Sequence, residues 1–240
     1  MSTSARLLLV LSLPLGLAAC DAEPAAQEPA DINPFPPVER PVSAIVSDQY
    51  SDEASRQETG EAETVLSVLG VEAGETVADI GAGRGFYMQR LASAVGPDGT
   101  VYAQDIFEDV VKDLSVRASA NGFSNVEAVL GTPDNPRLPE NSLDHAVMVH
   151  MYHEIENPYA LLWNLRDSLK PGASIAIVDA DRVTSRHGTP PALLECELAA
   201  VGFEQFAMAP LEDGRAYVAL FRATQPRPEP AEIEPCRNPG

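Results

Sequence analysis

Between residues 50 and 222 the chain alternates short apolar runs with longer segments whose apolar residues recur at helical spacing. Short apolar runs bounded by turn residues predict buried strands, and the longer amphipathic segments predict helices. The predicted strands cover residues 77–80, 101–104, 126–130, 143–149, 174–178, 203–208 and 217–221. The predicted helices cover residues 58–69, 86–95, 108–120, 158–169 and 191–200. This alternation indicates an α/β protein with three layers: a doubly wound, mostly parallel sheet between helices, and a final hairpin that adds an antiparallel strand at one edge.

The most informative segment joins the first predicted strand to the helix that follows it. After Asp79 it places glycine at every second position, as Gly81, Gly83 and Gly85. Glycine has no Cβ and adopts positive φ, so such a loop lets a ligand approach the backbone, and the next helix directs its free N–H groups there. A dinucleotide-binding loop has the spacing G-x-G-x-x-G, but here the sixth position is Phe86. The pattern D-x-G-x-G-x-G resembles the first motif of the class I methyltransferases that depend on S-adenosylmethionine (SAM).

The order of strands and helices is also similar to the seven-stranded fold of that family over about residues 50–222. The resemblance implies an enzyme that transfers a methyl group from SAM to a small-molecule acceptor. It assigns cofactor binding to eight residues: Asp79, Gly81, Ala82, Gly83, Gly85, Asp105, Ile106 and Asp134.

Three acids of this set have separate implied roles. Asp79 holds the glycine loop or the amine of the cofactor. Asp105, at the end of the second strand, accepts hydrogen bonds from both ribose hydroxyls, which requires a carboxylate. Asp134 follows the third strand in a loop that resembles the adenine-binding loop of the family, because Leu138 and Pro139 come at the usual offset. The resemblance implies that Asp134 contacts the adenine amine.

Acceptor-facing groups in this family follow the fourth strand, where this chain has Tyr152, His153 and Glu154. Much of the acceleration of methyl transfer comes from holding the reactants together, which contributes roughly 7–11 kcal/mol. If the acceptor arrives protonated, His153 is the expected base, because imidazole exchanges protons near neutral pH. Glu154 then orients His153 or takes that role itself, and Tyr152 is a hydrogen-bond partner. The alternative is a polar strand end that caps the next helix.

His150 and His153 also suggest a metal-binding pair. Two histidines and a glutamate without a fixed helical register do not define a coordination site, so no metal is expected. The formal net charge of −20 makes nucleic acid an unfavourable partner, since phosphate binding needs a basic surface. The same charge disfavours electrostatic docking on anionic lipid.

The first residues resemble an export signal. Residues 1–19 have an apolar stretch too short to span a bilayer, and they lead to Cys20 through Leu17-Ala18-Ala19. This quartet resembles a bacterial lipobox, which implies a lipidated Cys20 and a protein anchored in the cell envelope, on the periplasmic side of a membrane. A plain secretory peptide cut near residue 19 is the alternative.

Composition then divides the remaining chain into three parts. Residues 20–41 form a disordered tether rich in Pro, Ala and Glu, residues 42–224 form the methyltransferase domain, and the Pro-rich residues 225–240 form a disordered tail. In an exported protein Cys196 and Cys236 either pair or remain free, because sequence does not supply the geometry.

Two functions are compatible with these features. The motif residues favour a membrane-anchored methyltransferase. The expected location favours a non-catalytic lipoprotein that keeps the fold to bind another ligand or a partner, because SAM is made in the cytoplasm and fold alone does not settle function. The acceptor and the oligomeric state are not indicated by the sequence.

Overall fold

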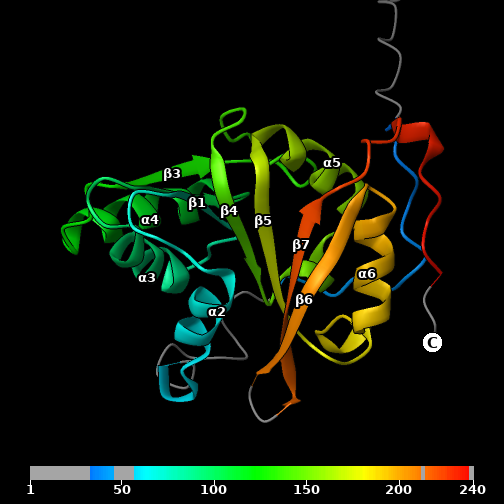
Figure 1. Ribbon diagram of the computed structural model, residues 1–240, viewed down its shortest axis with the longest axis horizontal. Coiled ribbons are helices and arrows are strands. Elements are labelled where there is room, and N and C mark those ends of the chain that lie inside the picture. The colour runs from blue at the N-terminus through cyan, green and yellow to red at the C-terminus, as the bar shows by residue number, and fades with distance from the viewer. Residues whose placement is uncertain (1–32, 46–56, 212–213, 238–240) are drawn as a thin grey trace, which may run out of the picture. The chain divides into compact units, whose positions relative to one another are not determined.

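The computed structural model describes residues 33–45, 57–211 and 214–237. Within them, strands and helices alternate as the hydrophobic pattern predicts (Figure 1). The expected signal peptide, Cys20 and the tether up to residue 32 lie outside the described residues. The strands are β1 (Thr76–Ile80), β2 (Thr100–Asp105), β3 (Val126–Leu130), β4 (Leu143–Val149), β5 (Leu169–Ala180), β6 (Phe203–Leu211) and β7 (Ala216–Ala223). The helices are α2 (Glu61–Leu69), α3 (Phe86–Val95), α4 (Glu108–Ala120), α5 (Pro158–Ser168) and α6 (Pro191–Ala199), with short 3₁₀ helices η1 (Tyr152–Glu154), η2 (Thr184–Arg186) and η4 (Pro230–Glu232).

These strands form one sheet in the order β3-β2-β1-β4-β5-β7-β6. Neighbouring strands from β3 to β5 pair in parallel, whereas β7 is antiparallel to both β5 and β6. The prediction of a doubly wound, mostly parallel sheet with an antiparallel strand from the final hairpin is therefore confirmed. The chain moves outward from β1 to β3 and then returns to β4 on the other side of β1. Ligands bind at such a switch point, beyond the carboxyl ends of the strands.

One detail of the prediction is wrong, because the antiparallel strand is not at the edge. β7 lies inside the sheet between β5 and β6, and β6 forms the edge (Figure 1). The burial of the side chains explains this order. The first six residues of β7 are all buried, whereas most residues of β6 are alternately exposed and partly buried. A continuous apolar run suits an interior strand, and alternation suits an edge strand with one face toward solvent.

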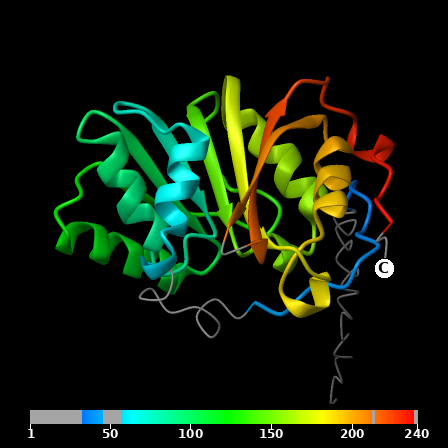
Figure 2. The same cartoon turned by 60° about the horizontal axis from the view of Figure 1, so that its bottom comes forward.

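Helices cover both faces of the sheet (Figure 2). α2, α3 and α4 pack with Val77 and Val147 on one face, and α5 and α6 pack with Ile80 and Met148 on the other. Neighbouring residues of a strand point to opposite faces, so the buried strands β1 and β4 supply both cores. In the part of the chain that the structure describes, none of the helices combines the length and apolar character needed to cross a membrane.

The C-terminal segment differs from the expected disordered tail. Residues 225–237 run beside α5 and α6, where Cys236 forms a disulfide with Cys196 of α6 (Figure 1). The indole Nε1 of Trp163 donates to the carbonyl of Pro228 at 2.8 Å. High proline content predicts disorder from local composition, but here contacts with distant residues supply the order that the segment lacks on its own.

The N-terminal segment also differs from the expectation over part of its length. Within the described part of the tether, residues 33–41, the guanidinium Nε of Arg40 lies 2.8 Å from Oε1 of Glu197 on α6. Both side chains are fully buried. A short parallel bridge joins Glu39 to Arg237, so the two terminal segments contact each other. A buried ion pair of this kind fixes a segment that composition alone marks as flexible.

Candidate functional site

The three glycines after β1 adopt positive φ, at 68° for Gly81, 52° for Gly83 and 78° for Gly85. A Cβ added to Gly81 would lie 3.0 Å from Cε of Met151, and one added to Gly85 would lie 2.9 Å from Cδ2 of Leu114. These two glycines therefore allow close packing of the loop. Among the described residues, no heavy atom beyond its chain neighbours lies within 4 Å of the Cβ position of Gly83. The loop thus has open backbone at its centre, as a ligand cradle requires.

Asp105, the last residue of β2, faces this loop. Its Oδ2 accepts a hydrogen bond from the backbone N–H of Gly83 at 3.0 Å. Its Oδ1 accepts from the N–H groups of Ile106 and Phe107 at 2.8 Å and 3.1 Å. A carboxylate has about four lone-pair positions. Asp105 therefore fixes the glycine loop and can still accept a hydrogen bond from a ligand hydroxyl.

The other side of the loop is attached to the sheet. The N–H of Ala82 donates to the backbone carbonyl of Gln104 at 2.9 Å. Asp79 is buried within β1, in register with Ala103 of β2 and Val147 of β4. The loop and its preceding acid are thus held by neighbouring strands, at the switch point of the sheet.

Two apolar side chains that the sequence reasoning did not select lie at the same edge. Phe107 lies two residues after the end of β2 and Leu130 ends β3, and their exposed fractions are 46% and 40%. Asp134 is exposed in the turn after β3, and its backbone carbonyl accepts a hydrogen bond from Nδ2 of Asn164 at 2.8 Å. Exposed apolar groups beside Asp105 are suited to contact a flat organic ring.

A buried carboxylate connects this loop region to the end of β4. Glu61 of α2 accepts a hydrogen bond from the hydroxyl of Tyr87 through Oε1, at 2.8 Å. Its Oε2 lies 2.7 Å from Nε2 of His150. Sequence reasoning missed Glu61 because it precedes the motif, although an acid in the first turn of an amphipathic helix is visible in the chain. The contact shows that His150 is engaged by α2.

His153 forms a buried pair with a second carboxylate that was not predicted. Its Nδ1 lies 3.0 Å from both oxygens of Asp179 on β5. Asp179 is fully buried and also accepts hydrogen bonds from the backbone N–H of Ala180 at 2.8 Å and the hydroxyl of Thr189 at 2.7 Å. Because a carboxylate only accepts, Nδ1 carries a proton, and in the neutral imidazole Nε2 then has the lone pair. Asp179, rather than Glu154, therefore orients the imidazole.

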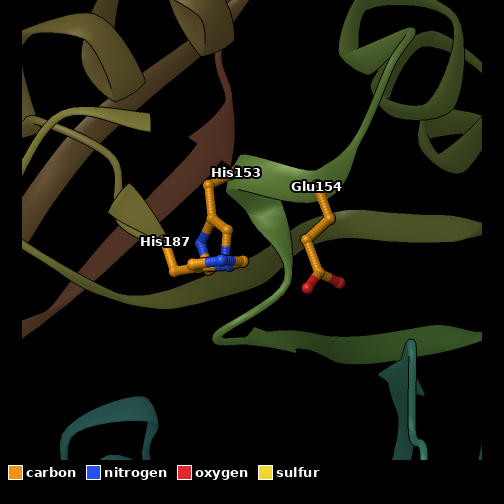
Figure 3. Close-up of side chains that lie close together, drawn as sticks. All are labelled: His153, Glu154 and His187. Carbon is orange, nitrogen blue, oxygen red and sulfur yellow. The ribbon is translucent and has the colours of Figure 1, made fainter. Parts of the chain in front are cut away.

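Two further side chains converge on His153 (Figure 3). Glu154 comes from the same 3₁₀ helix, η1, and His187 comes from the loop after η2. The two imidazole rings meet edge to face, with centroids 5.4 Å apart. This group lies beyond the carboxyl ends of β4 and β5, the same edge of the sheet as the glycine loop.

Tyr152 does not belong to this group. It is fully buried, and the guanidinium of Arg40 lies 5.6 Å from its ring centroid. Burial raises the pKa of the Tyr152 phenol well above its ordinary value, and the nearby carboxylate of Glu197 adds to the effect. The hydroxyl therefore faces a buried ion pair, and the predicted acceptor-side role for Tyr152 has no support in this geometry.

Comparisons with known proteins agree with this fold. Residues 77–172 match a family described as a methyltransferase domain. The chain is 26% identical over 122 residues to the demethylmenaquinone methyltransferase of Geobacillus kaustophilus, a match covering 51% of this chain and 52% of that protein. It is 34% identical over 83 residues to the nocamycin O-methyltransferase of Saccharothrix syringae, covering 35% of this chain and 30% of that protein. A SAM dependent methyltransferase from Aquifex aeolicus has a similar structure, with TM-score 0.66 and 26% identity over 72% of this chain and 100% of that chain.

The chain therefore contains a methyltransferase domain at residues 77–172, and its fold is that of a SAM dependent methyltransferase. It spans about half the length of the curated demethylmenaquinone methyltransferases that it matches. The glycine loop, Asp105 and His153 lie within the matched residues 77–172, whereas Asp179 and His187 lie beyond them. The sequence thus pointed to the glycine loop, Asp105 and His153 but not to the residues that surround His153 in the structure. One signal for Asp179 was available, namely an acid at the end of the strand that follows β4.

Proposed function

We propose that this protein transfers a methyl group from SAM to a small organic acceptor. The observation that carries the proposal is the open backbone of Gly83 opposite the carboxylate of Asp105, which holds that glycine through a 3.0 Å hydrogen bond. The cofactor would supply a methyl group on a positively charged sulfonium, suited to in-line displacement. The role of the chain is then to bind and orient the cofactor and the acceptor and to exclude water. Where the acceptor carries a proton, the chain also removes it.

The residues of the cofactor side fit the parts of SAM. The remaining acceptor position of Asp105 suits one ribose hydroxyl, and the open backbone at Gly83 suits close approach of the methionine part. The exposed faces of Phe107 and Leu130, together with Ile106, suit the adenine ring. Asp134 remains the proposed partner of the adenine amine.

On the acceptor side we assign proton removal to His153. Asp179 fixes the imidazole through Nδ1, so Nε2 is the atom that would take a proton from an acceptor hydroxyl, thiol or acidic carbon. The relatives named for demethylmenaquinone and nocamycin support a small organic acceptor. Met151 packs against Gly81, which brings the segment carrying His153 beside the cofactor loop.

The proposal includes attachment to the periplasmic side of a membrane through a lipid on Cys20. Support comes from Leu17-Ala18-Ala19-Cys20 and from the Cys196–Cys236 disulfide, because structural disulfides persist mainly in oxidising compartments. Replacing Cys20 with Ser should release the protein from the membrane fraction. A Cys20→Ser protein that stays in the membrane pellet like the parent would rule out the lipid anchor.

Calorimetry of the full chain in detergent, titrated with SAM and with S-adenosylhomocysteine, tests the central claim. We expect saturable binding of both compounds at one site per chain. Transfer of a radiolabelled methyl group to phenol and quinol acceptors then tests catalysis. Binding without transfer to any acceptor would favour the non-catalytic lipoprotein, and a chain that binds neither compound would refute the cofactor assignment itself.

A further inference from the structure

The cluster of His153, Glu154 and His187 has the composition of a metal site. Each residue offers one ligand atom, and these three atoms all lie within 4.8 Å of one another (Figure 3). The sequence pointed to His150 as the partner of His153, but His150 is engaged by Glu61. The fold instead brings in His187 from a distant loop. We propose that His153, His187 and Glu154 together bind one divalent transition-metal ion.

The orientation of His153 matches that of a metal-bound histidine. Asp179 accepts from Nδ1, which leaves the Nε2 lone pair for coordination. Metal-binding histidines almost always donate their other ring N–H in this way, and a carboxylate is a common partner. Asp179 is itself fixed by Ala180 and Thr189, and the hydroxyl of Tyr217 donates to the carbonyl of Thr189 at 2.7 Å. The imidazole is therefore positioned before any ion arrives.

His187 is held in place by an unusual backbone conformation. Its φ is 56°, in the left-handed region that residues other than glycine rarely adopt. The N–H of His187 donates to the carbonyl of Thr184 at 3.1 Å, and its own carbonyl accepts from Nε of Arg182 at 3.0 Å. The next residue, Gly188, has no room for a side chain, because a Cβ there would lie 2.5 Å from the carbonyl of Ala180. Strained residues of this kind concentrate at ligand sites.

The donor set indicates the class of ion. Two imidazoles and one carboxylate suit borderline ions such as Zn²⁺, whereas Mg²⁺ and Ca²⁺ prefer oxygen ligands alone. Bonds of about 2.0–2.1 Å in a tetrahedral site place ligand atoms about 3.3–3.5 Å apart, so binding would draw the three side chains somewhat closer. Three protein ligands leave one position open for an oxygen atom of a substrate.

A role for the ion in methyl transfer rests on the proposed function, whereas metal binding does not. An ion on Nε2 of His153 would occupy the lone pair that a general base uses. With the ion bound, the metal rather than the imidazole would polarise an acceptor oxygen, and the proton would leave to solvent. His153 is then a ligand, and activity should fall on metal removal and return on addition of the ion.

Equilibrium dialysis of the untagged, metal-stripped full chain with Zn²⁺ alone tests the site, with bound metal measured by elemental analysis. Co²⁺, whose visible absorption reports its coordination, is the second probe. We expect about one ion per chain. His187→Gly should weaken binding by at least about 100-fold while keeping the fold, because glycine adopts a φ of 56° without strain. Asp179→Asn should weaken it by about 10–100-fold, and Glu154→Gln should change the Co²⁺ spectrum.

His145→Gln is the matched control, since His145 also lies beside a carboxylate, 3.3 Å from Oε2 of Glu75, near the opposite edge of the sheet. This variant should bind Zn²⁺ like the parent. Failure of the parent to bind about one ion, or equal binding by His187→Gly and the parent, would overturn the metal site. Calorimetry with SAM on the metal-stripped protein separates the two proposals: SAM binding without metal binding refutes only the site, and the reverse refutes only the proposed cofactor.

Discussion

The two halves of the sheet are built from different kinds of contact. One half carries the proposed cofactor site and is called the cofactor half; it is formed by β1, β2 and β3 with α3 and α4. Its site depends on residues close in sequence, since Gly83 and Asp105 are 22 residues apart. The other half carries the proposed acceptor site and is called the acceptor half; it is formed by β4, β5, β7 and β6 with α5, α6 and the terminal segments. There Arg40 contacts Glu197, which is 157 residues away in the sequence. A site that depends on local backbone geometry has a recognisable sequence motif. Buried polar contacts between distant segments produce no such motif.

The largest expected effect tests the open backbone of the cofactor half. Gly83→Val should abolish SAM binding in calorimetry, because the side chain would fill the space in front of the loop. The φ of 52° also makes valine strained, so we expect a loss of stability of about 1–3 kcal/mol.

The variant Gly122→Val distinguishes the effect of backbone strain from the effect of blocking the SAM site. Gly122 has a φ of 77°, follows α4, and has no described atom beyond its chain neighbours within 4 Å of its Cβ position. The same substitution there should cost similar stability and leave SAM affinity unchanged. Retention of SAM binding by Gly83→Val would show that this backbone does not face the cofactor.

The next effect concerns the acceptor half. His153→Ala should lower turnover by about 10²–10⁴-fold with SAM affinity unchanged, whether the imidazole acts as base or as metal ligand. The pH–rate profile and its dependence on added Zn²⁺ distinguish the two roles. A variant with the same rate and the same acid limb as the parent would reduce His153 to a structural residue.

The contrast between the halves also explains which predictions succeeded. The strands and helices followed from hydrophobic periodicity, and the glycine loop followed from a motif contained in a few residues. Neither Asp179 nor His187 was assigned to His153, because they contact it only through the folded sheet, in which β5 pairs with β4. Arg40 lies in a segment whose composition indicates disorder. Composition does not reveal a buried partner elsewhere in the chain, such as Glu197.

A substitution of Arg40 tests how strongly the stability of the acceptor half depends on the ion pair with Glu197. Arg40→Met should lower the free energy of unfolding by about 3–5 kcal/mol, because Glu197 would remain buried without its partner. The guanidinium also faces the carbonyls of Tyr152 and Ile155, at 3.4 Å and 3.3 Å, so the segment carrying His153 should loosen. Urea unfolding of the full chain measures the change.

Two further variants test this explanation. The double variant Arg40→Met with Glu197→Leu should recover most of the stability, because no unpaired charge remains buried. Lys170→Met removes a partly exposed pair with Asp144, 2.7 Å apart, and should cost no more than about 1 kcal/mol. Equal losses for Arg40→Met and Lys170→Met would contradict a special role of the buried pair.

A smaller effect is expected for the carboxylate of the cofactor half. Asp105→Ala should weaken SAM binding by about 1.5–3 kcal/mol, the range for hydrogen bonds to a charged group. Because Asp105 also accepts from the N–H of Gly83, part of this loss comes from a looser loop. Asp105→Asn keeps one acceptor oxygen and should fall between the parent and the alanine variant. An unchanged dissociation constant for SAM would show that the ribose binds elsewhere.

The smallest effect is a pH dependence of stability in the acceptor half, away from its candidate site. Burial lowers the pKa of His145 below the ordinary histidine value; Arg222 acts in the same direction, while the carboxylates of Glu75 and Asp144 oppose the shift. In the unfolded chain the pKa is about 6.5. Between the two pKa values the unfolded state binds more protons, so the free energy of unfolding decreases as the pH falls through this window.

His145→Gln should remove this contribution. Between about pH 7.5 and about pH 5.5, the parent should then lose more stability in urea unfolding than the variant. SAM affinity and turnover at the higher pH should be the same in both proteins, because His145 lies near the amino end of β4 and His153 beyond its carboxyl end. An identical pH dependence would mean that the environment of His145 changes little on folding. A changed turnover would mean that the acceptor half transmits a perturbation along β4, so its long-range contacts would couple the two edges of the sheet.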